Sequence, residues 1–381
     1  MTRMVTVGVN LMWLVPGVVG GSEEYTVGLL RALDQLACDD LWLRLYGRQS
    51  LFEKYPELAR QFETQTPPTS LASKLARIAA ENTWLAAVSR RDDLVHHAGG
   101  LVPMVRSQTS VLTIFDLQPL EMPGNFSAVK RRWLATMLPR SARAARLVLC
   151  PSAFTAERIE SLLGLPAAKI RVVPHGHEPI QAGILDPGLD ADLRARYGRF
   201  LLLPAIAYRH KRHVDLIMAL DRLRQRFTDL SVVFTGRPGP ETPELQRLAN
   251  QLGLSDRVHY LNRVDEGELD ALYRSAIALV FPSQYEGFGI PVLEAMTRGC
   301  PVIATDAGAL PEVVGGAGLL VPPCHPGALA AAIARVLEEP GLSDQLRAAG
   351  IEQAARFSLI EAGRSLGDCY RQAVDLVTGA P

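Results

Sequence analysis

The sequence predicts an α/β protein with two doubly wound, Rossmann-like domains that face a central cleft. Short apolar, β-branched runs alternate with amphipathic helical patterns along the chain, and these units fall into two sets of six. A segment rich in Gly, Pro and Asp, near 176–192, separates the two sets. At 381 residues the chain is also too long for one ordinary core. We therefore expect domains at 1–178 and 190–360, and a C-terminal helix at 361–381 as a candidate to cross back to the first domain.

The individual elements follow from the spacing of apolar residues. In the first half, strands are predicted at 5–11, 41–46, 94–97, 111–115, 147–150 and 170–173. In the second half, they are predicted at 200–203, 231–234, 258–261, 276–281, 301–304 and 319–321. Helical spacing is clear at 24–36, 213–227, 268–275 and 358–378. Because ligands of such sheets bind beyond the carboxyl ends of the strands, functional residues are expected on the strand-to-helix loops.

The composition excludes several classes of protein. Lys+Arg and Asp+Glu both number 40, so the formal charge is zero, which argues against a nucleic-acid binder. The five cysteines lack metal-type spacing and are expected to be reduced thiols of a cytoplasmic protein. No apolar run reaches the ~18 residues of a membrane-spanning helix, and the N-terminus is expected to be a first strand rather than a leader.

Two carboxylates eight positions apart make 281–296 the most informative segment. Glu286 is expected on the loop that leaves the strand at 276–281, and Glu294 in the first turn of the following helix. The glycines between them, Gly287 and Gly289, would let the backbone approach a ligand closely. We interpret this segment as one that holds a sugar hydroxyl, a phosphate and a ribose diol together.

The start of the helix after Glu286 is predicted to bind an anion. The amides of Phe288, Gly289 and Ile290 would lack helical partners there. At this positive helix end Glu294 is expected to be ionised, which suits an acceptor of diol hydroxyls better than a general acid. A hydrolase-type pair of acid and base is discounted for that reason.

Three further loops contain candidate site residues. Gly20-Gly21 precedes a helix that Ser22 could cap, and it either faces a phosphate or acceptor or is a plain glycine turn. It lacks the Gly-x-Gly-x-x-Gly pattern, so a nicotinamide site is poorly supported. Asp116 follows the strand at 111–115 and either binds a substrate hydroxyl or caps a turn.

The loop after the first strand of the second half is strongly basic. Arg209, His210 and Lys211 lie there with a further arginine and histidine, which exceeds what a solvated loop needs. Lys211, with Arg209 nearby, could neutralise a diphosphate at the start of the next helix. No metal site is predicted from the spacing of His, Cys, Asp and Glu.

A basic stretch from Lys130 to Arg146 has two interpretations. Val129, Trp133 and Met137 share one helical face with Leu134, and cations flank it. The helix could touch an anionic membrane or a lipid-linked acceptor, which would place the protein at the inner face of the membrane. The alternative, which we favour, is a buried apolar stripe with a solvated basic face.

With these residues in view, the chain resembles the retaining nucleotide-sugar glycosyltransferases of group 1, or family 4, which have the GT-B fold. The E-x7-E signature of this family is matched from Glu286 to Glu294, and its continuation by the runs at 299–305 and 310–312. Weaker landmarks are matched in the expected order by Gly20-Gly21, Asp116, Pro151-Ser152, Val173-Pro174 and His210-Lys211.

The resemblance implies roles for these residues. The N-terminal domain would bind a glycan, lipid-linked or small-molecule acceptor, and the C-terminal domain a nucleotide sugar such as GDP-mannose or a UDP-sugar. Glu286 would face the donor sugar and Glu294 the ribose. Lys211 would pair with the diphosphate, and Gly20-Gly21 would line the phosphate side. The family transfers a hexose with retention, usually without metal or cofactor, so Glu286, Lys211 and Asp116 are the expected catalytic residues.

The chain departs from the family pattern at two positions. Many relatives have His-Asp where this chain has Phe115 and Asp116, and many have an Arg where it has Ala205; Arg209 or His210 could substitute. The alternatives left open are a non-catalytic sugar-nucleotide-binding subunit and an epimerase or phosphorylase of the same fold.

Overall fold

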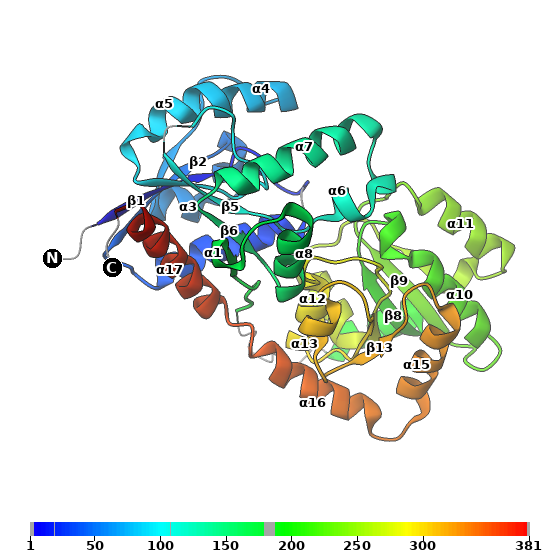
Figure 1. The fold of residues 1–381 in the computed structure, drawn as a ribbon. Helices are drawn as coiled ribbons and strands as arrows, with labels where there is room; N and C mark the ends of the chain where they lie inside the picture. The colour runs from blue at the N-terminus through cyan, green and yellow to red at the C-terminus, as the bar shows by residue number, and fades with distance from the viewer. Residues whose placement is uncertain (1–3, 19, 107, 179–186, 379–381) are drawn as a thin grey trace. The chain divides into compact units, whose positions relative to one another are not determined.

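The computed structural model describes residues 4–18, 20–106, 108–178 and 187–378. It divides into two compact units (Figure 1). Unit 1 comprises Met1–Gly176 and Phe357–Pro381, and unit 2 comprises His177–Arg356. Of the predicted linker at 176–192, residues 179–186 lie outside the described residues.

Within the described residues, unit 1 has one parallel sheet of seven strands in the order β3-β2-β1-β4-β5-β6-β7. The strand order reverses between β1 and β4, which is the switch point where such sheets bind ligands. The strands are β1 Val5–Asn10, β2 Leu41–Tyr46, β3 Glu63–Gln65, β4 Leu94–His97, β5 Thr109–Thr113, β6 Leu147–Cys150 and β7 Ile170–Val172. β3 was not predicted from the sequence, because this short, polar edge strand has no apolar run.

The helices of unit 1 connect these strands and cover the sheet (Figure 1). The α-helices are α1 Gly21–Gln35, α2 Gln49–Lys54, α3 Pro56–Gln61, α4 Lys74–Ala80, α5 Ala86–Val88, α6 Gln118–Glu121, α7 Ala128–Ala144, α8 Ala153–Leu163 and α17 Leu359–Thr378. A π-helix, η1 Glu81–Leu85, and three 3-10 turns, η2 Ser89–Arg91, η3 Pro123–Asn125 and η4 Ala167–Lys169, complete the described part.

The C-terminal helix α17 packs in unit 1 against α1. A side chain at Gly363 would clash with Ala32 of α1, so the two helices approach closely there. Tyr370 is fully buried, and its hydroxyl lies 2.8 Å from Nδ1 of His96 on β4. The last residues of the chain that the structure describes therefore belong to the first core.

Unit 2 has a parallel sheet of six strands in its described part, in the order β10-β9-β8-β11-β12-β13. The strands are β8 Arg199–Pro204, β9 Leu230–Thr235, β10 Val258–Tyr260, β11 Ala278–Phe281, β12 Val302–Thr305 and β13 Leu319–Val321. β9, β11 and β12 are buried along their whole length, as expected for apolar strands covered on both faces. The order reverses between β8 and β11, which is therefore the switch point of this unit.

Most helices of unit 2 connect successive strands, but the first precedes β8 and the last two follow β13. The helices are α9 Pro187–Tyr197, α10 His213–Leu223, α11 Thr242–Gln251, α12 Glu266–Ser275, α13 Ile290–Thr297, α14 Leu310–Val314, α15 Pro326–Glu338 and α16 Leu342–Ala354, with 3-10 turns η5 Arg209–Lys211 and η6 Ser255–Arg257. The prediction of two doubly wound α/β domains is confirmed. Among the described residues, no helix combines the length and apolar character needed to cross a membrane.

Candidate functional site

Lys211 and Glu286 meet at the switch point of unit 2. Lys211 follows β8, Glu286 follows β11, and the lysine Nζ donates a hydrogen bond of 2.6 Å to Oε1 of the glutamate. The two side chains are only 19% and 13% exposed, so water screens their attraction less than that of a surface pair. The ammonium also lies 5.0 Å from the centre of the Phe281 ring. Two predicted catalytic residues are thus brought together.

Backbone contacts hold the two loops that carry this pair against each other. The carbonyl of His210 accepts hydrogen bonds from the Gln284 amide at 2.8 Å and from the Ser283 hydroxyl at 3.2 Å. Both donors lie just after β11, and the acceptor lies next to Lys211. The positions of Lys211 and Glu286 are therefore set by the backbone as well as by their own ion pair.

A third loop, which follows β12, supports Glu286 from the other side. The amide of Ala309 donates to the carbonyl of Glu286 at 3.0 Å. Gly308 has a φ of 61°, and a Cβ there would lie 2.6 Å from the same carbonyl oxygen. Only glycine fits this close approach of two backbones. The Thr305 hydroxyl ties the same loop to the Ser283 carbonyl.

The start of α13 lies directly beyond Glu286. Gly289 precedes the helix with a φ of 112°, and a Cβ there would lie 2.7 Å from Leu310. The carbonyl of Gly289 accepts from the amides of Val292 and Leu293. Ile290 begins the helix, so its amide has no acceptor in a preceding turn. Phe288 is buried and anchors the loop.

Glu294 lies in the second turn of α13, because the helix begins at Ile290; the prediction of a first-turn position was wrong. Its Oε2 accepts a hydrogen bond of 2.8 Å from the hydroxyl of Tyr273. Burial raises the pKa of Glu294, against the smaller opposing effects of Tyr273 and Arg298. Burial therefore opposes the ionisation that the helix end was expected to favour, and the helix dipole acts mainly within the first turn.

The other basic residues of the 209–213 loop differ in their surroundings. Arg209 is exposed, whereas Arg212 is paired with Asp215 through two hydrogen bonds of 2.6 and 2.9 Å. His210 is buried and stacks on Tyr208. Burial and the charge of Lys211 lower the pKa of His210 to about 4, so its imidazole is neutral at pH 7.

The candidate site residues of unit 1 lie in local turns of the backbone. Gly20 is the N-cap of α1 with a φ of 68°, and Gly21 is the first residue of the helix. Ser22 lies inside α1, so the prediction that it caps the helix was wrong. Asp116 accepts the Gln118 amide at 2.9 Å, which is the turn-cap geometry foreseen as one of its two interpretations.

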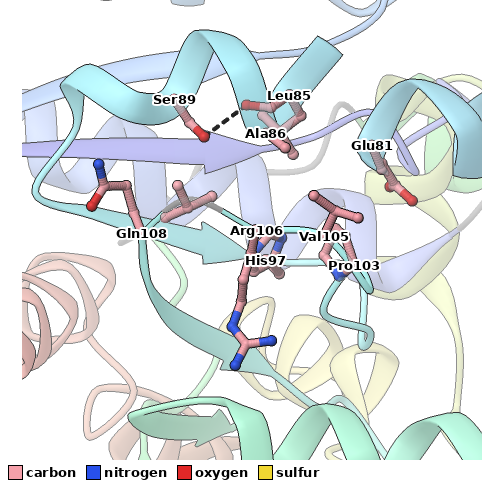
Figure 2. A pocket seen from close by; sticks show the side chains of 10 residues that line it. Glu81, Leu85, Ala86, Ser89, His97, Pro103, Val105, Arg106 and Gln108 are labelled. Atoms are coloured by element: carbon pink, nitrogen blue, oxygen red, sulfur yellow. Dashed lines mark hydrogen bonds between the residues drawn. The ribbon is translucent and has the colours of Figure 1, made fainter. Parts of the chain in front are cut away.

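A buried polar cluster at the switch point of unit 1 was not foreseen. The amide of Asn10, at the end of β1, lies 3.3 Å from Oε1 of Glu81 and 3.4 Å from Nδ1 of His97. Burial raises the pKa of Glu81 and lowers that of His97 to about 3. Figure 2 shows Glu81 and His97 around a small pocket that Arg106 also lines. Its volume of about 10 Å³ suits one water molecule.

The only local sign of this cluster in the sequence is His97 at the end of a predicted strand. Glu81 begins the π-helix η1, and such insertions often mark functional positions, but nothing in the spacing predicts one. In the part of the chain that the structure describes, no group of three or more His, Cys, Asp or Glu side chains is arranged as a metal site.

Two family models cover most of the chain. The model of "Glycosyl transferases group 1" matches residues 197–353, and that of "Glycosyltransferase Family 4" matches residues 19–179. The first match contains both glutamates and Lys211, and the second contains Gly20-Gly21 and Asp116.

Curated relatives agree with these matches. O-antigen chain mannosyltransferase B of Escherichia coli is 30% identical over 70% of this chain and 71% of that protein. D-inositol 3-phosphate glycosyltransferase 1 of Catenulispora acidiphila is 31% identical over 78% and 72%.

Solved structures share the fold at lower identity. The HepE protein of Anabaena in complex with UDP and glucose matches with a TM-score of 0.75 and 19% identity over 97% of this chain and 100% of that chain. Sucrose-phosphate synthase from Thermosynechococcus elongatus matches with a TM-score of 0.77 and 21% identity over 97% and 98%. These matches establish the GT-B fold, and together with the family models and relatives they show that the chain belongs to the group 1, or family 4, glycosyltransferases.

Proposed function

We propose that this enzyme transfers a hexose with retention from a nucleoside diphosphate sugar to a hydroxyl acceptor, and that unit 2 binds the donor. The Lys211–Glu286 pair carries the proposal, because it puts a cation and a carboxylate at the switch point, beside the start of α13. The cation and the helix start can bind a diphosphate, and the carboxylate can accept hydrogen bonds from sugar hydroxyls.

In this proposal the donor replaces the ion pair. The diphosphate binds Lys211 and the amide of Ile290. Glu286 then loses its partner and accepts hydrogen bonds from the sugar hydroxyls. As the glycosidic bond breaks, the leaving diphosphate gains negative charge that the ammonium and the helix end stabilise. These groups supply the positive charge that a metal supplies in other transferases, so we expect no metal requirement.

Glu294 is proposed to hold the ribose of the donor. A carboxylate accepts two diol hydroxyls, and Tyr273 orients this one through its hydrogen bond to Oε2. Arg209 is exposed next to Lys211 and supplies a second cation for the diphosphate. His210, being neutral, offers a ring nitrogen rather than a charge.

Unit 1 is proposed to bind the acceptor and the outer side of the phosphates. Gly20-Gly21 supplies an open backbone turn, since a Cβ on Gly20 would meet nothing within 4 Å. Asp116 places a carboxylate on the loop that follows β5. The proton of the acceptor hydroxyl goes to the leaving phosphate on the same face as the attack, so retention needs no protein nucleophile.

For the donor, GDP-mannose is our first proposal and UDP-glucose the second. The name of the E. coli relative supports mannose, and the UDP and glucose bound to the HepE protein support the alternative.

The decisive experiment measures nucleotide release by the purified enzyme from a panel of GDP- and UDP-sugars, without acceptor and with or without EDTA. We expect slow release from one donor, no effect of EDTA, and loss of release in Glu286→Gln. Glu352→Gln, an exposed carboxylate on α16, is the matched control and should behave as wild type.

Release that survives in Glu286→Gln would overturn the assignment of this residue, and release that needs a metal would overturn metal independence. If no donor is hydrolysed, calorimetry with the same panel decides, because absence of binding to every donor would contradict the proposal for unit 2.

A further inference from the structure

The first half of α7 is an exposed helix that carries apolar side chains. Val129 is 82% exposed and Trp133 is 38% exposed, whereas the buried residues of α7 are Leu138, Ser141 and Ala142, all in its second half. The favoured prediction of a buried stripe was therefore wrong for Val129 and Trp133, whereas Leu134 packs against the core and Met137 is half-buried. Figure 1 shows why, since the N-terminal end of α7 extends beyond the strands of unit 1.

The charge of α7 is unusual for its position. Its 17 residues include five cations and no carboxylate, and three of the cations, Lys130, Arg131 and Arg132, lie at the N-terminal end. Cations are disfavoured there because the helix macrodipole is positive at its N-terminus. An external anion would relieve this repulsion, so this helix end is suited to bind one.

Arg131 and Arg132 also line an open groove. The groove lies against α6 and η3, has a volume of about 490 Å³, and is otherwise walled by proline, leucine and alanine side chains. Guanidinium groups beside apolar walls suit a phosphate that is attached to an apolar body.

Neighbouring segments of unit 1 also carry cations and exposed apolar side chains. Arg140 lies on the helical face of Val129 and Trp133, and it donates to the carbonyls of Val102 and Met104. The Met104 side chain is 60% exposed. Lys74, at the start of α4, adds to burial in lowering the pKa of Lys130, against the smaller opposing effect of the Asp116 carboxylate. The adjacent Leu75 is exposed.

We propose that this face of unit 1, defined by Val129, Lys130, Arg131, Arg132 and Trp133, docks on an anionic phospholipid bilayer. Arg131 and Arg132 bind lipid phosphates, and Val129 and Trp133 enter the interfacial region. Basic residues that alternate with exposed apolar and indole side chains on one helix are the pattern of interfacial helices. This proposal goes beyond glycosyl transfer and does not depend on the donor.

The test is co-sedimentation of the full chain with vesicles. At low salt we expect binding to vesicles that contain phosphatidylglycerol and little binding to pure phosphatidylcholine. Arg131→Gln with Arg132→Gln should weaken the binding more than tenfold, because each cation near an anionic surface contributes about 1 kcal/mol. Trp133→Ala should weaken it severalfold, and this loss should persist at raised salt, where charges are screened.

The matched controls change exposed residues of unit 2. Arg247→Gln with Arg356→Gln removes the same charge, and Ile351→Ala removes an exposed apolar side chain; each should bind vesicles as wild type does. Donor hydrolysis and thermal melting should be unchanged in the α7 variants, which separates this proposal from that for the donor site.

Four results would overturn the proposal. The first is no wild-type binding to anionic vesicles at low salt, and the second is equal binding by the double α7 variant. The third is full competition by millimolar glycerol phosphate, which would indicate a site for a small phosphate rather than for a bilayer. Binding of α7 to an acidic protein or to RNA in place of vesicles would also contradict it.

Discussion

The two switch points have the same topology, but they differ in how firmly the fold holds their candidate residues. In unit 2, the loops after β8, β11 and β12 are tied together around Glu286, and the opposite charges of Lys211 and Glu286 are paired at 2.6 Å. In unit 1, a Cβ on Gly20 would meet nothing within 4 Å, and Asp116 caps its own turn. Long-range contacts hold Lys211 and Glu286 of unit 2 in place, whereas Gly20 and Asp116 of unit 1 are placed by their own turns.

This difference indicates where the geometry of the reaction is set. Catalytic groups are most effective when the fold orients them before the ligand arrives, and the long-range contacts of unit 2 orient Lys211 and Glu286, the residues proposed for this role. The open turn at Gly20 is less constrained by its surroundings. Changes in unit 2 should therefore affect turnover strongly, while equivalent changes in unit 1 should have smaller effects.

The largest effect is expected from Lys211→Met and Glu286→Gln. Each should lower turnover by roughly 10²–10³-fold, the usual cost of removing one group that stabilises developing charge. Lys211→Met should also cost about 1–3 kcal/mol of stability, because it leaves a mostly buried carboxylate without its partner. The double variant should regain much of that stability and remain inactive. Turnover and urea unfolding of the three variants check this.

The control for this cycle is the neighbouring pair of Arg212 and Asp215, which lie 2.6 Å apart. Arg212→Met should lower stability with far less effect on turnover. If it inactivates the enzyme as fully as Lys211→Met does, the loop as a whole rather than the Lys211 charge is responsible, and the assignment of Lys211 fails.

Alanine substitutions at a matched pair of glycines test the comparison between the two switch points, and their expected effects on turnover are of intermediate size. Gly308 and Gly20 have φ values of 61° and 68°, so alanine is strained at both. Only at Gly308 would the new Cβ also collide with the Glu286 backbone. Gly308→Ala should therefore lower turnover at least tenfold, and Gly20→Ala only a fewfold. Equal losses, with both proteins folded by circular dichroism, would remove the distinction between the two switch points.

The sequence was sufficient to predict that Lys211 and Glu286 lie on strand-to-helix loops, because both positions depend on one general rule. Apolar runs locate parallel strands, and residues just after neighbouring strands meet at one sheet edge. Glu294 was assigned one turn too early because the exact start of α13 depends on the positive φ of Gly289, which spacing alone does not indicate.

Other features could not be predicted because they depend on distant residues. Periodicity shows that Val129 and Trp133 share a helical face, but it cannot show that Val129 is left exposed and Trp133 only partly covered. The contact between Asn10 and Glu81 joins residues 71 positions apart and leaves no local pattern. Burial and long-range polar contacts thus account for most of the corrections.

The smallest expected effect concerns Glu294 and the pH dependence of stability. Burial raises its pKa in the folded chain, so the folded state binds this proton at a higher pH than the unfolded state does. Its contribution to the free energy of unfolding is therefore full below the ordinary carboxyl range and is lost as pH rises through the raised folded pKa.

Glu294→Gln should remove that part of the pH dependence, while its amide oxygen can still accept the Tyr273 hydroxyl. The measurement is urea unfolding of wild type and variant between pH 4 and 8, where the difference between the two curves isolates this carboxyl from other buried groups such as Glu81. A wild type that gains stability relative to Glu294→Gln as pH rises would mean that the folded pKa is lowered. The site would then favour a charged Glu294 before any ribose arrives, as the helix-end argument supposed, and Glu294 would be prepared for the ligand in the same way as Lys211 and Glu286.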